Sequence, residues 1–111
     1  MLNFEALNLK EEILKAVQDM GFTETTPIQE QAIPIALTGQ DVIGQAQTGT
    51  GKTAAFAIPF LQLIDQDPVV QVLILTPTRE LCIQVEKEVK KLSKYLRLKS
   101  VAVYGGQDIT R

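Results

Sequence analysis

The chain has 111 residues, of which 45% are hydrophobic and 22% are charged, and it contains no tryptophan. This composition is typical of a small globular domain with an aliphatic core and argues against a disordered chain. The single cysteine, Cys82, excludes a disulfide framework and a cysteine-rich metal site. No apolar run approaches the roughly 20 residues that a membrane helix needs, and no signal-peptide pattern opens the chain, so we expect a cytoplasmic protein.

The net charge of −2 is unevenly distributed, because residues 67–111 carry eight basic and five acidic side chains. Most of the excess basic side chains lie between residues 87 and 99. A solvated helix face and a surface that contacts phosphates are both compatible with this pattern, so the charge alone does not predict a nucleic-acid partner.

The first helix is predicted to begin near Asn8, which together with Glu11 forms a capping-box pattern. Apolar residues then recur at helical spacing as far as Met20. Gly21 follows and is expected to end the helix.

The second helix is predicted to begin after Thr26, which has the residue type of a helix cap. Pro27 suits the first helical position, and Gln29 would complete a capping box with Thr26. Pro34 is expected to kink this helix, and Gly39 is expected to end it.

The remaining sequence alternates short apolar segments with helical patterns. We expect strands at residues 41–45, 69–76 and 99–104, and helices at residues 51–64 and 77–96. This order favours an α/β fold with an open parallel sheet and helices on both faces. Three strands would leave the sheet edges exposed, which would allow self-association, and the chain is expected to be the front part of a larger domain.

A glycine-rich loop lies between the first predicted strand and the helix after it. Glycines let several backbone N–H groups converge on phosphates at a helix N-terminus, so we expect a bound nucleotide. Lys52 would reach the outer phosphates, and the Thr53 hydroxyl would bind Mg²⁺. A glycine-rich turn without a ligand is the alternative. The loop is Ala46, Gln47, Thr48, Gly49, Thr50, Gly51, Lys52 and Thr53, with Ala46 where the general pattern has glycine.

Gln29 is a candidate for reading the base of that nucleotide. Its amide can accept from the exocyclic amine of adenine and donate to the adjacent ring nitrogen, whereas guanine presents an acceptor in place of the amine. This predicts ATP rather than GTP. Phe4 or Phe22 can stack on the base. The alternative is that Gln29 only caps its helix.

Four spaced motifs resemble those of the DEAD-box ATP-dependent RNA helicases over residues 4–106. They are GFTETTPIQ (21–29), AQTGTGKT (46–53), PTRELCIQ (77–84) and Gly105-Gly106. In that family the loop begins with Ala or Gly, which accounts for Ala46. The resemblance implies that Phe4 contacts the adenine side, that Phe22 packs beside the glutamine segment, and that Thr26 shapes the turn around Gln29.

The resemblance also implies contacts with single-stranded RNA. Pro77, Thr78, Arg79 and Glu80 look like the family's first RNA-contacting motif, and Gly105 with Gly106 looks like a second. Such contacts hold the RNA backbone and are largely independent of base sequence. From the residues alone, Thr78 can equally be a helix cap and the two glycines a simple turn.

The implied fold is the P-loop, RecA-like fold. Residues 1–40 would form an N-terminal helical segment that carries the adenine-reading Q motif, and residues 41–111 the first part of the RecA-like domain. The sequence has no D-E-A-D and no S-A-T motif. We therefore expect an ATP-dependent RNA helicase in the full-length protein, with Lys52 and Thr53 acting on the phosphates, but no hydrolysis or unwinding by this chain alone. The alternatives are an isolated adenine-nucleotide-binding module and a folding or interaction module without helicase activity.

Overall fold

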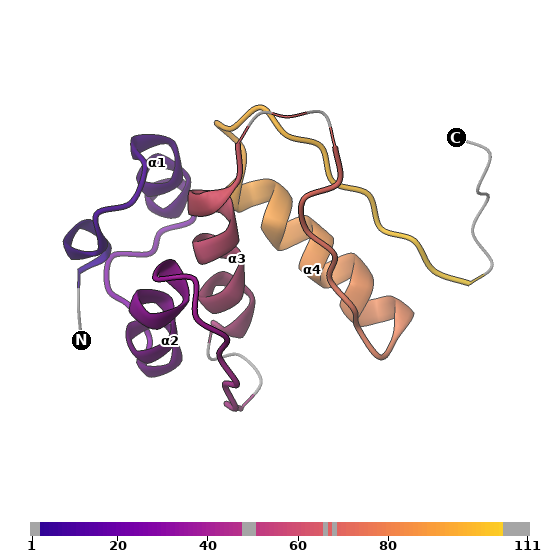
Figure 1. Cartoon of the computed structure of the whole chain (residues 1–111), viewed down its shortest axis with the longest axis horizontal. Coiled ribbons are helices and arrows are strands. Elements are labelled where there is room, and N and C mark those ends of the chain that lie inside the picture. The colour runs from indigo at the N-terminus through magenta and orange to yellow at the C-terminus, as the bar shows by residue number, and fades with distance from the viewer. Residues whose placement is uncertain (1–2, 48–50, 66, 68, 106–111) are drawn as a thin grey trace.

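The computed structural model describes residues 3–47, 51–65, 67 and 69–105. These residues form a short 3-10 helix, η1 (Phe4–Leu7), and the α-helices α1 (Glu11–Asp19), α2 (Pro27–Leu37), α3 (Lys52–Leu63) and α4 (Arg79–Leu92) (Figure 1). α3 occupies the centre, where it packs against α2, α4 and α1. The start of α3 lies beside α2, where Gln29 donates to the Gly51 carbonyl, and its other end lies beside the start of α1, where Lys10 contacts Leu61 and Ile64.

The chain enters α1 differently from the sequence prediction. Asn8 has φ 56° and ψ 44°, in the left-handed region, and it ends η1 instead of capping α1. The predicted capping box at Asn8 is wrong, because this turn needs a residue that tolerates the left-handed conformation, and asparagine does so better than most. Lys10 precedes α1, and its Nζ donates to the carbonyls of Leu61 and Ile64 at 3.3 and 3.2 Å. A lysine at these carbonyls also complements the negative end of the α3 dipole.

α2 begins as its sequence predicts. Thr26 is the cap, Pro27 is the first helical residue, and Gln29 Oε1 accepts the Thr26 N–H at 2.9 Å. The helix continues past Pro34 as far as Leu37. Gly39, with φ +84°, then turns the chain away, as the sequence predicts.

α4 begins at Arg79, and its cap is Thr78, whose Oγ1 accepts the N–H of Leu81 at 3.1 Å. The helix ends at Leu92, short of the predicted end at residue 96. Ser93 explains the early end, because its hydroxyl donates to the carbonyl of Val89 at 2.7 Å and the following residues form a turn. α3 runs to Leu63 without a break at the buried Pro59.

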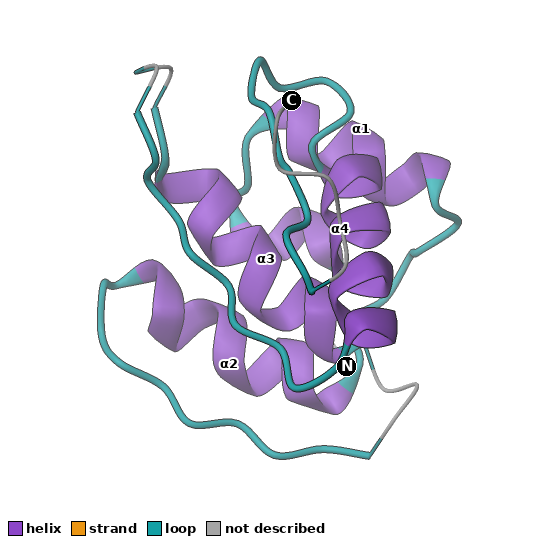
Figure 2. Cartoon of the chain, turned by 90° about the vertical axis from the view of Figure 1, so that its right-hand side faces the viewer, coloured by secondary structure: helices purple, strands orange, loops and turns teal. Residues whose placement is uncertain are grey.

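The three predicted strands are extended segments without ladder pairing. Among the described residues the only β-type pairing is an isolated antiparallel bridge between Asn3 and Glu24, and Figure 2 shows helices joined by loops. Side chains expected to be buried on both faces of a sheet are instead exposed, with Val70 at 89%, Leu73 at 79% and Leu75 at 85%. The expected parallel sheet is therefore not formed within the described part of the chain, since an apolar strand is covered only when neighbouring strands and helices pack on it.

The hydrophobic core connects the N-terminal helices η1, α1 and α2 with α3 and α4. Side chains from these five helices pack in one cluster. Its members include five large side chains with 0% exposure: Ile13, Ile33, Ile58, Leu61 and Leu92. Apart from Phe4 the buried side chains of this cluster are aliphatic, in line with the composition. Within the residues that the structure describes, no helix has the length and apolar character needed to cross a membrane.

A polar contact ties the end of α1 to the residues after α4. The Tyr95 hydroxyl donates to Asp19 Oδ2, Lys94 Nζ lies 3.5 Å from the same oxygen, and Lys15 Nζ lies 4.7 Å from the centre of the Tyr95 ring. The hydrogen bond from Tyr95 lowers the pKa of Asp19 below its ordinary value of 3.8. The same bond raises the pKa of Tyr95 above its ordinary value of 10.0.

We expect Tyr95→Phe to lower the free energy of unfolding by an amount that depends on pH. A lowered carboxyl pKa stabilises the fold above pH 3.8, and this contribution disappears as the pH falls through the folded-state pKa. A raised phenol pKa stabilises the fold below pH 10.0, and this contribution disappears as the pH rises through the folded-state pKa. Urea unfolding of both proteins at a series of pH values should give a difference that is constant between these limits and shrinks outside them. A difference that does not change with pH would contradict the assigned contact.

Candidate functional site

The described part of the glycine-rich loop ends at the N-terminus of α3. Gly51 is the cap residue of that helix, with φ 82° and ψ 27°. Lys52 is exposed and Thr53 is half-buried in the first helical turn, while Ala46 and Gln47 are the described residues at the start of the loop. The predicted site residues Thr48, Gly49 and Thr50 lie outside the described residues. The structure therefore places the predicted phosphate and Mg²⁺ ligands, Lys52 and Thr53, together at a helix N-terminus, where the dipole favours an anion.

Gln29 joins the N-terminal helical segment to this loop. Its side chain is 2% exposed, its Oε1 accepts from Thr26 N–H, and its Nε2 donates to the carbonyl of Gly51 at 3.1 Å. A Cβ atom added to Gly51 would overlap Nε2 and would also lie 3.2 Å from Thr26 Oγ1. The two predicted nucleotide-binding motifs are thus in direct contact, and only a glycine fits at their junction.

The two candidate aromatic residues pack on each other. The rings of Phe4 and Phe22 have centroids 6.4 Å apart and an interplanar angle of 19°. Phe4 is 3% exposed and belongs to the core, whereas Phe22 is half-buried at its edge. In this arrangement Phe22 offers more surface to a base than Phe4 does.

The second group of predicted residues surrounds a cleft at the start of α4. The cleft has a volume of about 390 Å³ and is lined by Thr76, Pro77, Thr78, Arg79, Cys82, Val103, Tyr104 and Gly105. Cys82 lies on the wall between the two segments, where its Sγ donates to the carbonyl of Val103 at 3.9 Å. Two segments more than twenty residues apart therefore line one cleft, which brings Pro77, Thr78 and Arg79 together with Gly105.

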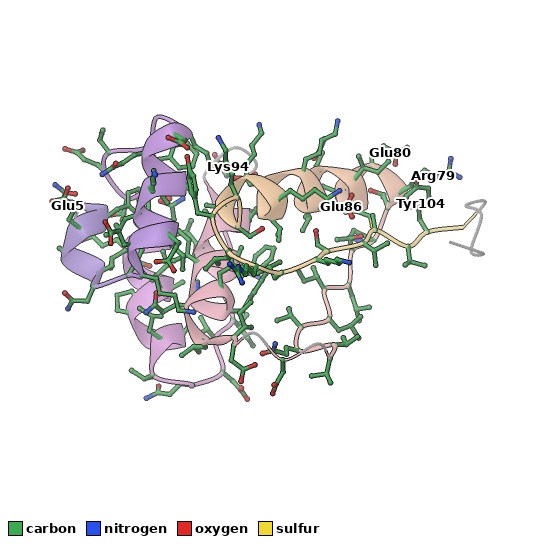
Figure 3. The ribbon with its side chains drawn as sticks, turned by 90° about the horizontal axis from the view of Figure 1, so that it is seen from above. Glu5, Arg79, Glu80, Glu86, Lys94 and Tyr104 are labelled. Carbon is green, nitrogen blue, oxygen red and sulfur yellow. The ribbon has the colours of Figure 1, made fainter. Side chains whose placement is uncertain are left out.

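Direct contacts hold the two sides of this cleft together. Arg79 Nη2 donates to the carbonyl of Gly105 at 3.2 Å, and the guanidinium carbon lies 5.4 Å from the centre of the Tyr104 ring. Figure 3 shows Arg79 and Tyr104 beside each other at one end of α4, with Lys94 toward the other end. Glu80 is exposed beside Arg79, and Gly106 lies outside the described residues. Thr78 caps α4 and also lines the cleft, so its role as a helix cap leaves it in a position to contact a ligand.

A further hollow lies between the end of α1 and the outer face of α4. It has a volume of about 790 Å³ and is lined by Ala16, Asp19, Met20, Phe22, Gln84, Lys87, Glu88, Lys91 and Lys94. Of the predicted site residues it includes only Phe22. Its lysines account for part of the basic stretch of the sequence, and Lys94 is already paired with Asp19.

The sequence did not point to Tyr104, which lines the cleft beside Arg79. An aromatic residue before a glycine pair at the end of an apolar segment gives no sign of this contact, because Arg79 comes from a distant part of the chain. The described residues contain no group of three or more His, Cys, Asp or Glu side chains that could hold a metal ion.

The sequence profile of the family described as DEAD/DEAH box helicase matches residues 26–111. The chain belongs to this family. It is 52% identical to the DEAD-box ATP-dependent RNA helicase RhpA of Helicobacter pylori over 98% of the chain and 22% of that protein. It is 56% identical to the ATP-dependent RNA helicase CshA of Listeria monocytogenes over 100% of the chain and 22% of that protein. The chain thus spans about a fifth of the length of these relatives.

Solved DEAD-box structures follow the same backbone path. The crystal structure of a DEAD box protein from Methanococcus jannaschii aligns with a TM-score of 0.92 and 44% identity, over 98% of the chain and 30% of that structure. The RNA helicase Prp28 from Chaetomium thermophilum, bound to ADP, aligns with a TM-score of 0.87 and 43% identity, over 97% of the chain and 28% of that structure. These alignments support the RecA-like fold of DEAD-box helicases, although the described residues form no sheet.

Proposed function

We propose that this chain is the ATP-binding and RNA-binding N-terminal portion of an ATP-dependent RNA helicase that unwinds short RNA duplexes. The observation that carries the proposal is the contact between Gln29 and Gly51, which joins the segment expected to read adenine to the loop expected to hold phosphates. In a glycine-rich turn without a ligand, neither a buried glutamine nor a glycine-only junction would be needed.

Adenine reading by Gln29 remains compatible with its contacts inside the protein. The amide oxygen and the amide nitrogen each make one hydrogen bond: Oε1 accepts from Thr26 N–H, and Nε2 donates to the Gly51 carbonyl. An amide oxygen has a second lone pair and an amide nitrogen a second hydrogen, so both remain able to bind one edge of a base. The contacts fix the orientation of the amide, which favours the acceptor and donor order of adenine over that of guanine. The half-buried Phe22 is the ring that can contact the base.

The residues at the start of α3 fit a nucleotide with Mg²⁺. Gly51 admits the Gln29 amide where a Cβ would lie, Lys52 is exposed at the helix N-terminus and can reach phosphate oxygens, and the Thr53 hydroxyl can bind the metal. The metal supplies charge neutralisation at the phosphates when it is bound. The chain's own residues bind and orient the phosphates.

The cleft at the start of α4 supports RNA binding through the backbone. Arg79, the Thr78 hydroxyl and the backbone around Gly105 converge on it, and groups of this kind bind phosphates without reading bases. RNA would therefore bind with little dependence on base sequence and with a strong dependence on salt.

We expect no steady hydrolysis of ATP by this chain alone. Hydrolysis needs an acid that helps to hold the metal, a group that positions water, and an arginine for the developing charge, and the sequence contains neither D-E-A-D nor S-A-T. A phosphate-release assay with and without single-stranded RNA should remain at the background of the Lys52→Ala variant. A rate well above that background would contradict this part of the proposal.

The position of bound RNA can be tested through the chain's single thiol. Cys82 is half-buried in the wall of the cleft, so RNA held by Thr78, Arg79 and Gly105 would cover it. We expect a saturating single-stranded oligouridine to slow the alkylation of Cys82 by iodoacetamide severalfold, as measured by mass spectrometry.

Arg79→Ala should lose this protection at the same RNA concentration, whereas Lys87→Ala, on the outer face of α4, should keep it. Saturating RNA that leaves the alkylation rate unchanged would place the RNA elsewhere. The absence of any RNA binding by the chain would remove the RNA part of the proposed function.

A further inference from the structure

The cleft at the start of α4 contains an arginine that lies against a neighbouring aromatic ring. Arg79 is exposed, and its two described contacts are the hydrogen bond to the carbonyl of Gly105 and the approach of its guanidinium to the Tyr104 ring, at 5.4 Å. Both contacts come from the residues at the end of the last extended segment. Tyr104 is half-buried, so its ring is itself held by the surrounding structure.

The two contacts leave most of the guanidinium available for a ligand. An arginine side chain has several N–H donors, of which one is used by the Gly105 carbonyl. A ring against the guanidinium consumes none of these donors, because the cation is attracted to the aromatic π-system. An unrestrained arginine loses rotamer entropy when it is fixed, so an arginine already held in place binds an anion with less loss.

We infer that Tyr104 is a positioning residue for RNA, whose ring holds Arg79 so that the free N–H groups of Arg79 face a phosphate bound in the cleft. The inference rests on the proposed RNA-binding function and assigns a further residue to that site. Thr78 and Gly105 line the same cleft, so a phosphate there would meet a hydroxyl, backbone groups and a fixed guanidinium together. Tyr104 acts through Arg79 and does not itself need to contact RNA.

This role differs from two simpler ones in what it predicts. If the Tyr104 ring contacted a base or ribose directly, its loss would weaken binding independently of Arg79. If the ring only packed in the protein, its loss would change stability and leave RNA affinity unaltered. If it positions Arg79, removing the ring and removing the guanidinium must have overlapping effects, because they eliminate the same contact with phosphate.

Fluorescence anisotropy with single-stranded oligouridine across a series of salt concentrations tests the effect on RNA binding. We expect Arg79→Ala to weaken binding about tenfold and to reduce the slope of log affinity against log salt by about 1. Tyr104→Leu should weaken binding in the same direction, and the double variant should bind no more weakly than Arg79→Ala. Tyr104→Phe, which keeps the ring, should bind RNA as the wild type does. Lys87→Ala removes a charge from the same helix and is the matched control. Additive losses in the double variant would overturn the inference.

NMR of the arginine side chains tests the positioning itself, without RNA. The chain has three arginines, so Arg97 and Arg111 are internal references for the Nε–Hε signal of Arg79. We expect the Arg79 signal to be shifted by the Tyr104 ring in the wild type and in Tyr104→Phe, and to move to an unrestrained position in Tyr104→Leu. An Arg79 signal that is the same in Tyr104→Leu and in the wild type would overturn the inference.

The two experiments separate failure of the inference from failure of the proposed function. A wild-type chain that binds no RNA would refute the RNA-binding function, while the NMR comparison would still decide whether Tyr104 holds Arg79. Should Tyr104→Leu fail to fold, Arg79→Lys leaves the ring intact and keeps the charge but removes the guanidinium fork. That variant should keep the salt slope and lose affinity, whereas unchanged affinity would overturn the inference.

Discussion

Gly51→Ala is expected to lower the free energy of unfolding by about 2–5 kcal/mol. Gly51 has φ 82°, a conformation that costs a residue with a Cβ about 1–2 kcal/mol. The added Cβ would also overlap Gln29 Nε2 and displace a buried amide that makes two hydrogen bonds. The Thr26 N–H would then lose its partner, at a cost of about 1–3 kcal/mol.

Gly39→Ala is the matched control, because Gly39 has φ +84° and nothing lies within 4 Å of an added Cβ. Urea unfolding should show Gly39→Ala losing only the backbone contribution, and Gly51→Ala losing clearly more. The excess should shrink in the background of Gln29→Ala, where the side chain that collides with the Cβ is gone. Equal losses in the two glycine variants would mean that Gln29 does not press against the loop as described.

The helix starts at Thr26 and Thr78 could be predicted from the sequence because each depends on a few neighbouring residues. A threonine cap followed by proline specifies the start of α2 locally, and the threonine in Pro77-Thr78 specifies the start of α4. Asn8 shows the limit of this reasoning. The same residue type serves as a helix cap and as a left-handed turn, and the chain around η1 requires the turn.

The predicted strands show a different limit. An alternating or continuous apolar pattern indicates that a segment is to be covered, but pairing depends on partners elsewhere in the structure. Leu73 and Leu75 are exposed because nothing in the described chain packs over their face of the segment, whereas Ile74 between them packs against the core. The apolar pattern therefore indicates a strand-like segment at residues 69–76. The predicted pairing into a parallel sheet is not formed in the described part of the chain.

The candidate site could be predicted where one motif carries its own chemistry. Lys52 and Thr53 follow from the glycine-rich loop, and Gln29 follows from the hydrogen-bonding edges of adenine. The contact of Gln29 with Gly51, the exposure of Phe22 relative to Phe4, and the approach of Tyr104 to Arg79 come from tertiary packing between distant segments. No local pattern encodes such distances.

Adenine nucleotides are expected to stabilise the chain, and guanine nucleotides are not. A ligand that binds only the folded state adds about 2.7 kcal/mol at about one hundred times its dissociation constant. For a chain of this size that is a rise of several degrees in Tm. Lys52→Ala should remove the shift by removing the phosphate contact. Gln29→Ala should also remove the shift, because it removes the adenine contact together with the Gly51 contact.

The most direct measurement is therefore the Tm of the chain during titration with Mg-ADP, Mg-ATP and Mg-GTP, beside Lys52→Ala, Gln29→Ala and the control Lys87→Ala. The shift caused by each nucleotide is compared within each variant, so that a variant's own change in stability does not enter the comparison. A rise with ADP and ATP but not GTP, lost in the first two variants and kept in Lys87→Ala, is the predicted result. No rise with any nucleotide, or an equal rise with GTP, would contradict an adenine-reading site built on Gln29 and Gly51, and the chain would then be better described as a folding or interaction module.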